Sequence, residues 1–369
     1  MRLLVALAFA LLAGGCGDRG AAPAVSKATT TGTTADPAAV TDPAVVAGSE
    51  GVLNAAIKPG TPGCSAAVGV KGKPVWVGVR GVANLATGEP ITPDTVFDIA
   101  SVSKQFTATA ILLLAQAGKL ALNDLLSQHM PGLPAWATTV TVAQLMHHTS
   151  GIPDYTGLLQ AQGYGIRDRT TQEQALEALA GVTALNFPPG TSFEYSNSNY
   201  LLLGEIVQRV SGTPLPQYLN AAIFSPLGLA MVVDPVGHVP HKAVSYEKVD
   251  GQYQVADSPW EQIGDGSIQT TPSQLVRWAD NYRTGTVGGR KLLDDQLAGA
   301  VETEPGGANR YGAGIYLMSN GTLDHDGAWG GFVTAFRVSA DRVKALSVSC
   351  NTDKQDAEAL ADSLAKLWM

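Results

Sequence analysis

Alternating apolar and polar positions near both ends of the chain predict β-strands. Residues 64–71 and 74–80 alternate on either side of a turn at Gly72 and Lys73, which is typical of a β-hairpin. Other extended segments are predicted at residues 95–99, 264–270, 312–319, 331–339 and 343–350. The strands are therefore expected mainly at the two ends of the chain.

Between these strands, the apolar positions recur with the period of an α-helix. Phe106, Ala110 and Leu114 share one helical face. They predict a helix over residues 106–118, and Gly118 marks its end. Further helices are predicted at residues 49–57, 141–148, 171–180, 197–211, 216–224, 272–282 and 355–368.

This order of elements favours the α+β class. We expect an antiparallel sheet flanked by helices, built from residues 48–99 and 264–369, with an inserted helical subdomain over residues 100–263. Ligand sites favour the junction between two such parts, so the cleft between them is the expected site.

An export pattern begins the chain. Arg2 precedes an apolar run over residues 3–12, and small residues follow up to Cys16. This is typical of a signal peptide over residues 1–15 and is too short for a permanent membrane span. Residues 12–16 resemble a bacterial lipobox with one extra glycine. We therefore expect a periplasmic or cell-surface lipoprotein, anchored in the membrane through lipid on Cys16, with ordinary signal-peptidase cleavage as the alternative.

Composition separates a leader from a folded domain. Residues 16–47 are mostly small residues and proline, without large side chains to build a core, so we expect a disordered tether there. Residues 48–369 remain for the folded domain. The net charge of -8, without a cluster of Lys and Arg, argues against a nucleic-acid partner.

Ser101 and Lys104 lie where the extended run at residues 95–99 gives way to the helix at residues 106–118. Residues three apart share a helical face, so both side chains should point into one cleft. A helix N-terminus also favours negative charge that develops during a reaction. The pair therefore predicts a nucleophile beside its base.

Two further Ser-x-x-Lys patterns differ from the first in their predicted local structure. Ser245 and Lys248 fall in a hairpin predicted over residues 243–256, where residues three apart face opposite sides. Ser363 and Lys366 fall on the solvent-facing side of the last helix. Neither pair predicts a catalytic dyad.

Two later stretches carry polar residues suited to a cleft. Tyr195 and Asn197 lie at the start of the helix predicted over residues 197–211. His325 and Asp326 begin a glycine-rich loop in which the backbone could approach a ligand closely. Each stretch is weak evidence alone, and the two gain weight from their order after Ser101.

His147 and His148 do not predict a metal site. Adjacent helical side chains diverge by about 100°, and no nearby Cys or carboxylate spacing completes a ligand set. A capping role at the C-terminal end of the helix over residues 141–148 suits them better. No metal and no cofactor are predicted.

With these motifs, the chain resembles the serine β-lactamase and penicillin-binding-protein superfamily, in the branch of class C β-lactamases, D-alanyl-D-alanine carboxypeptidases and family VIII esterases. The motif positions, in the order of the family, are Ser101 to Lys104, Tyr195 to Asn197 and His325 to Gly327. Supporting matches lie at residues 145–155, 224–228 and 264–267. The resemblance covers about residues 50–369 and implies a β-lactamase/transpeptidase-like fold.

The resemblance also implies an acyl-transfer mechanism. Ser101 would attack an acyl carbon with Lys104 or Tyr195 as its base, and the choice of base stays open. The N–H groups of Ser101 and Ala328 would form the oxyanion hole. The substrate-binding and oxyanion positions are Asn197, His325, Asp326, Gly327 and Ala328.

The function implied is an exported serine hydrolase of a small ester or amide. A β-lactamase or D-Ala-D-Ala carboxypeptidase is the first alternative, and a non-catalytic penicillin- or peptidoglycan-binding module is the second. Asp326 stands where penicillin-reactive relatives usually carry threonine, and a neutral His325 would supply no compensating cation. We therefore expect neutral esters or amides, or substrates with a free amine, to be preferred over penicillins.

Cys64 begins one predicted strand and Cys350 ends another. If Cys16 carries lipid, these two cysteines remain as an even pair in an oxidising compartment. We predict a disulfide between them, since the two strand ends meet if these strands pair antiparallel, and two separate buried thiols are the alternative.

Overall fold

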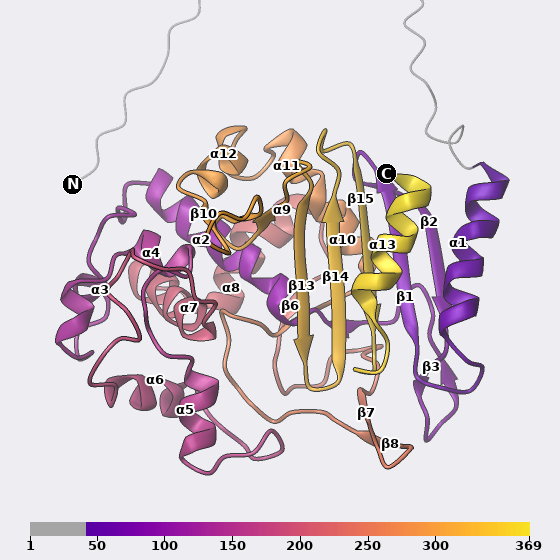
Figure 1. Cartoon of the computed structure of the whole chain (residues 1–369), viewed down its shortest axis with the longest axis horizontal. Helices are drawn as coiled ribbons and strands as arrows, with labels where there is room; N and C mark the ends of the chain where they lie inside the picture. The colour runs from indigo at the N-terminus through magenta and orange to yellow at the C-terminus, as the bar shows by residue number, and fades with distance from the viewer. Residues whose placement is uncertain (1–41) are drawn as a thin grey trace, which may run out of the picture. The chain divides into compact units, whose positions relative to one another are not determined.

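The computed structural model describes residues 42–369 (Figure 1). Their main feature is an eight-stranded antiparallel sheet with the strand order β10-β11-β12-β13-β14-β15-β1-β2. Its strands are β1 (Cys64–Val70), β2 (Lys73–Arg80), β10 (Val301–Glu302), β11 (Arg310–Tyr311), β12 (Tyr316–Leu317), β13 (Leu323–Trp329), β14 (Phe332–Val338) and β15 (Lys344–Cys350). Strands from both ends of the described chain thus share one sheet, which confirms the predicted α+β class.

Helices surround this sheet and fill the middle of the chain. They are α1 (Pro43–Ala56), η2 (Ala100–Ser103), α2 (Lys104–Gln116), α3 (Leu126–His129), η3 (Ala135–Thr138), α4 (Val142–Met146), α5 (Tyr155–Ala161), α6 (Gln172–Ala180), α7 (Asn197–Ser211), α8 (Leu215–Leu219), η4 (Asn220–Phe224), α9 (Ser225–Leu227), α10 (Pro272–Ala279), α11 (Asn281–Thr284), α12 (Lys291–Leu297) and α13 (Ala357–Trp368).

Three smaller sheets complete the structure. β3 (Val82–Asn84) pairs with β4 (Glu89–Pro90), and β9 (Ile268–Thr270) lies between β5 (Phe97–Asp98) and β6 (Val232–Val233). The hairpin of β7 (Tyr246–Val249) and β8 (Gln252–Val255) turns at Asp250 and Gly251, as the sequence predicts.

The long strands alternate their side chains between two cores. Ala66 and Val68 of β1 face the helices α1 and α13, whose side chains include Leu53 and Leu364. Ala67 belongs to the larger core on the other face, together with Val276 of α10. Figure 1 shows α13 next to β15 and α1 next to β2. The sheet is therefore covered by helices on both faces.

Helix α2 is buried on nearly every side, which makes it the centre of the larger core. The Phe106 ring lies 4.6 Å from the Trp278 ring of α10, measured between centroids. The Gln105 side chain accepts a hydrogen bond from the Tyr282 hydroxyl at 2.9 Å. These contacts hold α2 so that its first turn reaches the sheet.

The predicted tether ends earlier than its composition indicates. Helix α1 begins at Pro43, and the Asp42 carboxylate accepts a hydrogen bond from the Ala44 N–H at 2.8 Å. An acidic N-cap followed by proline is a helix start, and Val46 then packs against the core beneath α13. The rest of the tether, the signal peptide and Cys16 lie outside the described residues.

Two predictions near the C-terminus were wrong. Residues 325–329 belong to strand β13 instead of a loop, and most of residues 312–319 is irregular instead of a strand. A Cβ on Gly314 would lie 2.7 Å from the backbone of α2, so this loop is pressed against that helix. The glycines allow close backbone contacts, and such contacts occur in a strand as readily as in a loop.

The bridge between Cys64 and Cys350 is confirmed. The two residues are direct partners in the antiparallel register of β1 and β15, and their sulfur atoms are bonded at 2.08 Å. The bridge joins positions separated by 286 residues in the sequence.

None of the helices within residues 42–369 is both long and apolar enough to cross a membrane.

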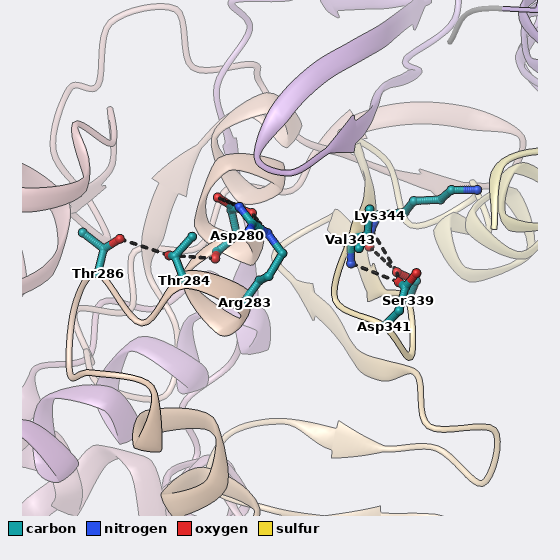
Figure 2. A network of polar contacts seen from close by, with 8 residues as sticks. All are labelled: Asp280, Arg283, Thr284, Thr286, Ser339, Asp341, Val343 and Lys344. Carbon is teal, nitrogen blue, oxygen red and sulfur yellow. Dashed lines mark hydrogen bonds and ion pairs between the residues drawn. The ribbon is translucent and has the colours of Figure 1, made fainter. Parts of the chain in front are cut away.

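A polar network fixes the turn between β14 and β15 (Figure 2). The Ser339 hydroxyl donates to Asp341 Oδ1 at 2.6 Å, and the same oxygen accepts from the Val343 N–H at 3.0 Å. These bonds lower the pKa of the Asp341 carboxyl. Figure 2 also shows the ion pair of Asp280 with Arg283 near the end of α10. The turn sets the register of the strand that carries Cys350.

Candidate active site

Ser101 lies in η2, the short turn that leads into α2. Ala100 before it has a φ of 46°, which non-glycine residues rarely adopt. The Ala100 N–H donates to Oδ1 of the buried Asp98 at 2.8 Å, which holds this conformation. Backbone strain of this kind is typical of functional positions, and here it presents the predicted nucleophile.

Lys104 is the first residue of α2, and its side chain is fully buried. Its Nζ donates to Ser101 Oγ at 3.0 Å, to Asn197 Oδ1 at 2.8 Å and to the main-chain oxygen of Asp265 at 2.7 Å. An ammonium has three N–H donors, so all of them are used. The structure thus brings Ser101, Lys104 and Asn197 together.

Burial lowers the pKa of the Lys104 ammonium to about 8, although the carboxylates of Asp265 and Asp154 oppose this shift. An ordinary lysine is almost fully protonated at neutral pH. Lys104 loses its proton more readily, which suits a group that has to accept one from a neighbouring hydroxyl.

Tyr195 places its phenol in the same cleft. Its ring centroid lies 5.0 Å from Lys104 Nζ. Burial raises the pKa of the Tyr195 phenol. The phenol oxygen is buried and forms no hydrogen bond with any of residues 42–369. A buried polar group is normally hydrogen-bonded, so this oxygen lacks a partner that a substrate could supply.

Asp154 is a contributor that the sequence analysis placed only within a supporting match. Its Oδ2 accepts from both the main-chain N–H and the side-chain Nδ2 of Asn197, at 2.7 and 3.0 Å. These bonds turn the amide oxygen of Asn197 toward Lys104 and leave the second N–H of Nδ2 for a substrate. The position of Asp154 before helix α5 is an N-cap pattern, which could have drawn attention to it.

His148 packs against one face of the Tyr195 ring. The two rings stack with centroids 4.2 Å apart, and His148 Nδ1 accepts from the Ser196 N–H at 3.2 Å. Burial and the neighbouring Lys104 lower the pKa of His148, so the imidazole is neutral. His147 instead ends α4, where its N–H donates to the Ala143 carbonyl.

Within residues 42–369, His, Cys, Asp and Glu side chains form no group of three or more that could hold a metal ion.

Strand β13 brings the third motif to the cleft. His325 is buried, with Nδ1 2.7 Å from the Asp326 carbonyl and Nε2 3.2 Å from the Tyr311 hydroxyl. Burial lowers the pKa of His325 to about 3, so the ring is neutral as expected. A Cβ on Gly327 would lie 2.4 Å from the Ile99 carbonyl oxygen and 2.9 Å from the Ser101 nitrogen. Only glycine lets β13 approach η2 so closely.

The Asp326 carboxylate has a cation beside it, contrary to expectation. Arg337 on β14 donates from Nη1 to Asp326 and to Asp324, both at 2.7 Å. Arg337 is opposite Asp324 in the strand register, so all three side chains lie on one face of the sheet. Burial raises the pKa of Asp326, and the guanidinium opposes that shift. The sequence motif contains no sign of Arg337, because the contact depends on strand pairing.

These residues share a cavity of about 770 Å³. It is lined by Ser101, Tyr195, Asn197, Tyr316, His325, Asp326, Gly327, Ala328, Val333, Thr334 and residues 353–358. The structure therefore brings together the sequence-predicted residues from all three motifs, except that Lys104 lies beneath the surface of the cavity behind Ser101.

Comparison with known sequences finds the family described as Beta-lactamase, whose model matches residues 42–367. A penicillin-binding protein of Bacillus subtilis (strain 168) is 27% identical over 300 residues, which cover 74% of this chain and 64% of the relative. Penicillin-binding protein 4 of Amycolatopsis lactamdurans is 28% identical over 312 residues, covering 75% of this chain and 77% of the relative. The chain thus spans less than two thirds of the Bacillus relative's length.

Solved structures with the same fold include an amidase and a hydrolase. The D-amino acid amidase of Ochrobactrum anthropi SV3 superposes with a TM-score of 0.74 at 23% identity, covering 88% of this chain and 98% of the amidase. EstCE1, described as a hydrolase with promiscuous acyltransferase activity, has a TM-score of 0.75 at 19% identity, with coverage of 88% and 98%. At these identities the likeness establishes the fold alone.

Proposed function

The chain belongs to the β-lactamase family, and on that basis we propose that it is a serine hydrolase that cleaves a small ester or amide through an acyl-enzyme at Ser101. The observation that carries this proposal is the hydrogen-bonded group of Ser101, Lys104 and Asn197 beside the cavity. A serine hydroxyl is a weak nucleophile until a base removes its proton, and Lys104 is in position to do so.

In the proposed reaction, neutral Lys104 accepts the proton of Ser101 Oγ while Oγ bonds to the acyl carbon. The carbonyl electron pair moves to its oxygen, where the N–H groups of Ser101 and Ala328 would stabilise the charge. Lys104 then returns the proton to the leaving alcohol or amine as its bond to the acyl carbon breaks. Water attacks the acyl-enzyme by the same route and releases the acid.

The pKa values favour Lys104 over Tyr195 as the base. Burial moves the pKa of Lys104 down toward neutral pH and moves the pKa of Tyr195 up, away from it. A phenolate would therefore be scarce at neutral pH, whereas a neutral amine would not. Tyr195 is better suited to bind the substrate or to donate a proton to the leaving group.

A β-lactamase or D-Ala-D-Ala carboxypeptidase remains the second candidate, and Arg337 is the observation that favours it. The substrates of these enzymes carry a carboxylate, and the ion pair with Arg337 reduces the repulsion that Asp326 alone would exert. A non-catalytic penicillin- or peptidoglycan-binding module is the third candidate. The N-terminal sequence supports export to the periplasm or cell surface, with Cys16 as a lipid anchor.

Labelling by a fluorophosphonate probe tests the proposal. We expect an adduct on the wild-type protein and none on Ser101→Ala, with unchanged folding by circular dichroism. Ser363→Ala is the matched control, because Ser363 belongs to the exposed Ser-x-x-Lys pattern on α13 and should leave labelling intact. An adduct of full intensity on Ser101→Ala, found by intact mass, would contradict the assignment. Fluorescent penicillin used in parallel separates the first two candidates.

A further inference from the structure

A smaller recess of about 50 Å³ adjoins Ser101. Its walls include Tyr155, Asn197, Trp260 and Asp265, and Ser101 lines both this recess and the larger cavity. Its volume suits a group of a few heavy atoms at most.

Asp265 is the unusual residue in this recess. It is only 9% exposed, and its Oδ2 accepts a hydrogen bond from the Tyr155 hydroxyl at 3.0 Å. Its Oδ1 is buried and has no hydrogen-bond partner among residues 42–369. A buried carboxylate oxygen left unpaired is costly, so its presence calls for a partner that arrives with a ligand.

Aromatic rings surround the same space. Trp260 is almost fully buried, and its ring meets that of Trp329 edge to face at 5.3 Å between centroids. The Tyr155 ring lies 6.3 Å from Trp260. Aromatic faces attract cations and exclude anions, so the rings and the carboxylate select the same kind of ligand.

Asp265 lies close to Ser101, so a cationic ligand group bound by Asp265 would also lie close to Ser101. Lys104 Nζ donates both to Ser101 Oγ and to the main-chain oxygen of Asp265, so the two residues are joined through a single ammonium. Lys104 has no donor left for the Asp265 carboxylate, because its three hydrogen bonds go elsewhere. The unpaired oxygen is therefore free for a substrate group close to the acyl carbon.

We propose that this recess binds the α-ammonium group of the substrate, so that the enzyme acts on esters or amides of amino acids with an unblocked amine. The assignment rests on the proposed serine hydrolase function and makes it more specific. In such compounds the amino nitrogen is two bonds from the acyl carbon, which matches a recess that adjoins Ser101. Asp265 accepts the ammonium through Oδ1, and Tyr155 holds the carboxylate by its other oxygen.

The test compares three substrates of the full-length protein: alanine benzyl ester, N-acetylalanine benzyl ester and benzyl propionate, with both enantiomers of alanine. We expect wild-type kcat/KM to be at least about tenfold higher for one enantiomer of the alanine ester than for the other two esters. Asp265→Asn should lower kcat/KM for that ester about 30-fold or more, the scale for losing one partner of a buried charge pair. Its effect on benzyl propionate should be much smaller.

The ratio of kcat/KM for alanine benzyl ester to that for benzyl propionate separates loss of amine recognition from a general catalytic defect. A change at Lys104 would lower kcat/KM for both esters. Asp94→Asn is the matched control, because Asp94 is exposed and lines neither cavity. An unchanged ester ratio in Asp265→Asn, or a wild-type preference for the acetylated or propionate ester, overturns the recess assignment. A failure of Ser101 to react with the fluorophosphonate probe overturns the hydrolase proposal instead.

Binding gives an answer that does not depend on turnover. The Ser101→Ala variant is titrated with alaninamide and with propionamide, and the intrinsic tryptophan fluorescence is followed, because Trp260 and Trp329 line the recess. Saturable binding of alaninamide alone, lost when Asp265→Asn is added, supports the proposal. Equal responses to both amides, or none to alaninamide, overturn it even if the hydrolase function stands.

Discussion

The two lysines that follow serine at the same spacing show how environment changes chemistry. Lys104 is fully buried and donates to Ser101, whereas Lys366 lies on the exposed side of the last helix. Burial lowers the pKa of Lys104 to about 8. The same side chain is therefore suited to accept a proton at position 104 and is a solvated charge at position 366.

This difference predicts the pH dependence of the reaction. Lys104 has to be neutral to accept a proton, so kcat/KM should fall as the pH drops below its pKa and level off above it. We expect the midpoint near pH 8, measured with a neutral ester whose own charge does not change. Lys104→Ala should lower the acylation rate by about 100-fold or more.

Lys366→Ala provides the comparison and should keep the wild-type rate and profile. A midpoint that stays near pH 8 in Lys104→Ala would assign the titration to another group.

The paired state of Asp326 predicts a moderate effect on substrate choice. Removing this carboxylate with Asp326→Thr should raise kcat/KM for a penicillin or cephalosporin relative to a p-nitrophenyl ester by about tenfold. An uncompensated charge at about 4 Å would repel a substrate carboxylate by roughly 4 kcal/mol, but Arg337 already offsets part of that repulsion. Steady-state kinetics with both substrates measures the ratio.

The exposed control Asp94→Thr should leave that ratio unchanged. If wild-type protein already prefers the β-lactam, the preference for esters and amides is wrong.

At the scale of single residues, motif spacing predicted which side chains meet. It missed Asp154 and Arg337, which form hydrogen bonds with Asn197 and Asp326. Ser101, Lys104, Tyr195 and Asn197 lie in motifs with a known order along the chain. Arg337 could not be found in this way, because it reaches Asp326 only after β13 and β14 have paired.

At the scale of elements, the prediction succeeded where periodicity and stop signals agreed. The helix over residues 197–211 has the predicted bounds, and Gly212 follows it with a φ of 71°. Strand β13 was missed because its glycine suggested a loop. Where a strand lies against another backbone, glycine allows the close approach and does not indicate a turn.

The close approach of β13 to η2 predicts the result of adding a methyl group there. Gly327→Ala would bring a Cβ to 2.4 Å from the Ile99 carbonyl oxygen, so β13 and η2 would have to separate. We expect kcat/KM to fall about 100-fold, the scale of a displacement near 1 Å in an active site. Ester kinetics and a thermal melt measure both consequences.

Gly157→Ala is the matched control, because Gly157 lies in α5 with open space around its Cβ position. It should change neither activity nor the melting temperature by much. Wild-type kcat/KM in Gly327→Ala would show that the two backbones can move apart freely.

At the scale of the whole molecule, the disulfide ties the N-terminal strands to the C-terminal ones. Removing it with Cys64→Ala and Cys350→Ala together should lower the free energy of unfolding by about 2–4 kcal/mol, because the bridge closes a very long loop. The melting temperature should fall by roughly 4–8 °C. Differential scanning calorimetry with and without reductant measures the change.

Reductant should have no effect on the double variant. Two free thiols in wild-type protein produced in an oxidising compartment, counted under denaturing and non-reducing conditions, would contradict the bridge.

The pairing of β1 with β15 also imposes an order on the events of folding. Residues 64–70 are synthesised long before residues 344–350, which form their partner strand. The helical residues around α2 and α7 can find one another sooner, while the first hairpin has no edge to join until Lys344–Cys350 arrives. Contacts this distant in sequence slow folding. The eight-stranded sheet therefore cannot close until β15 has been made.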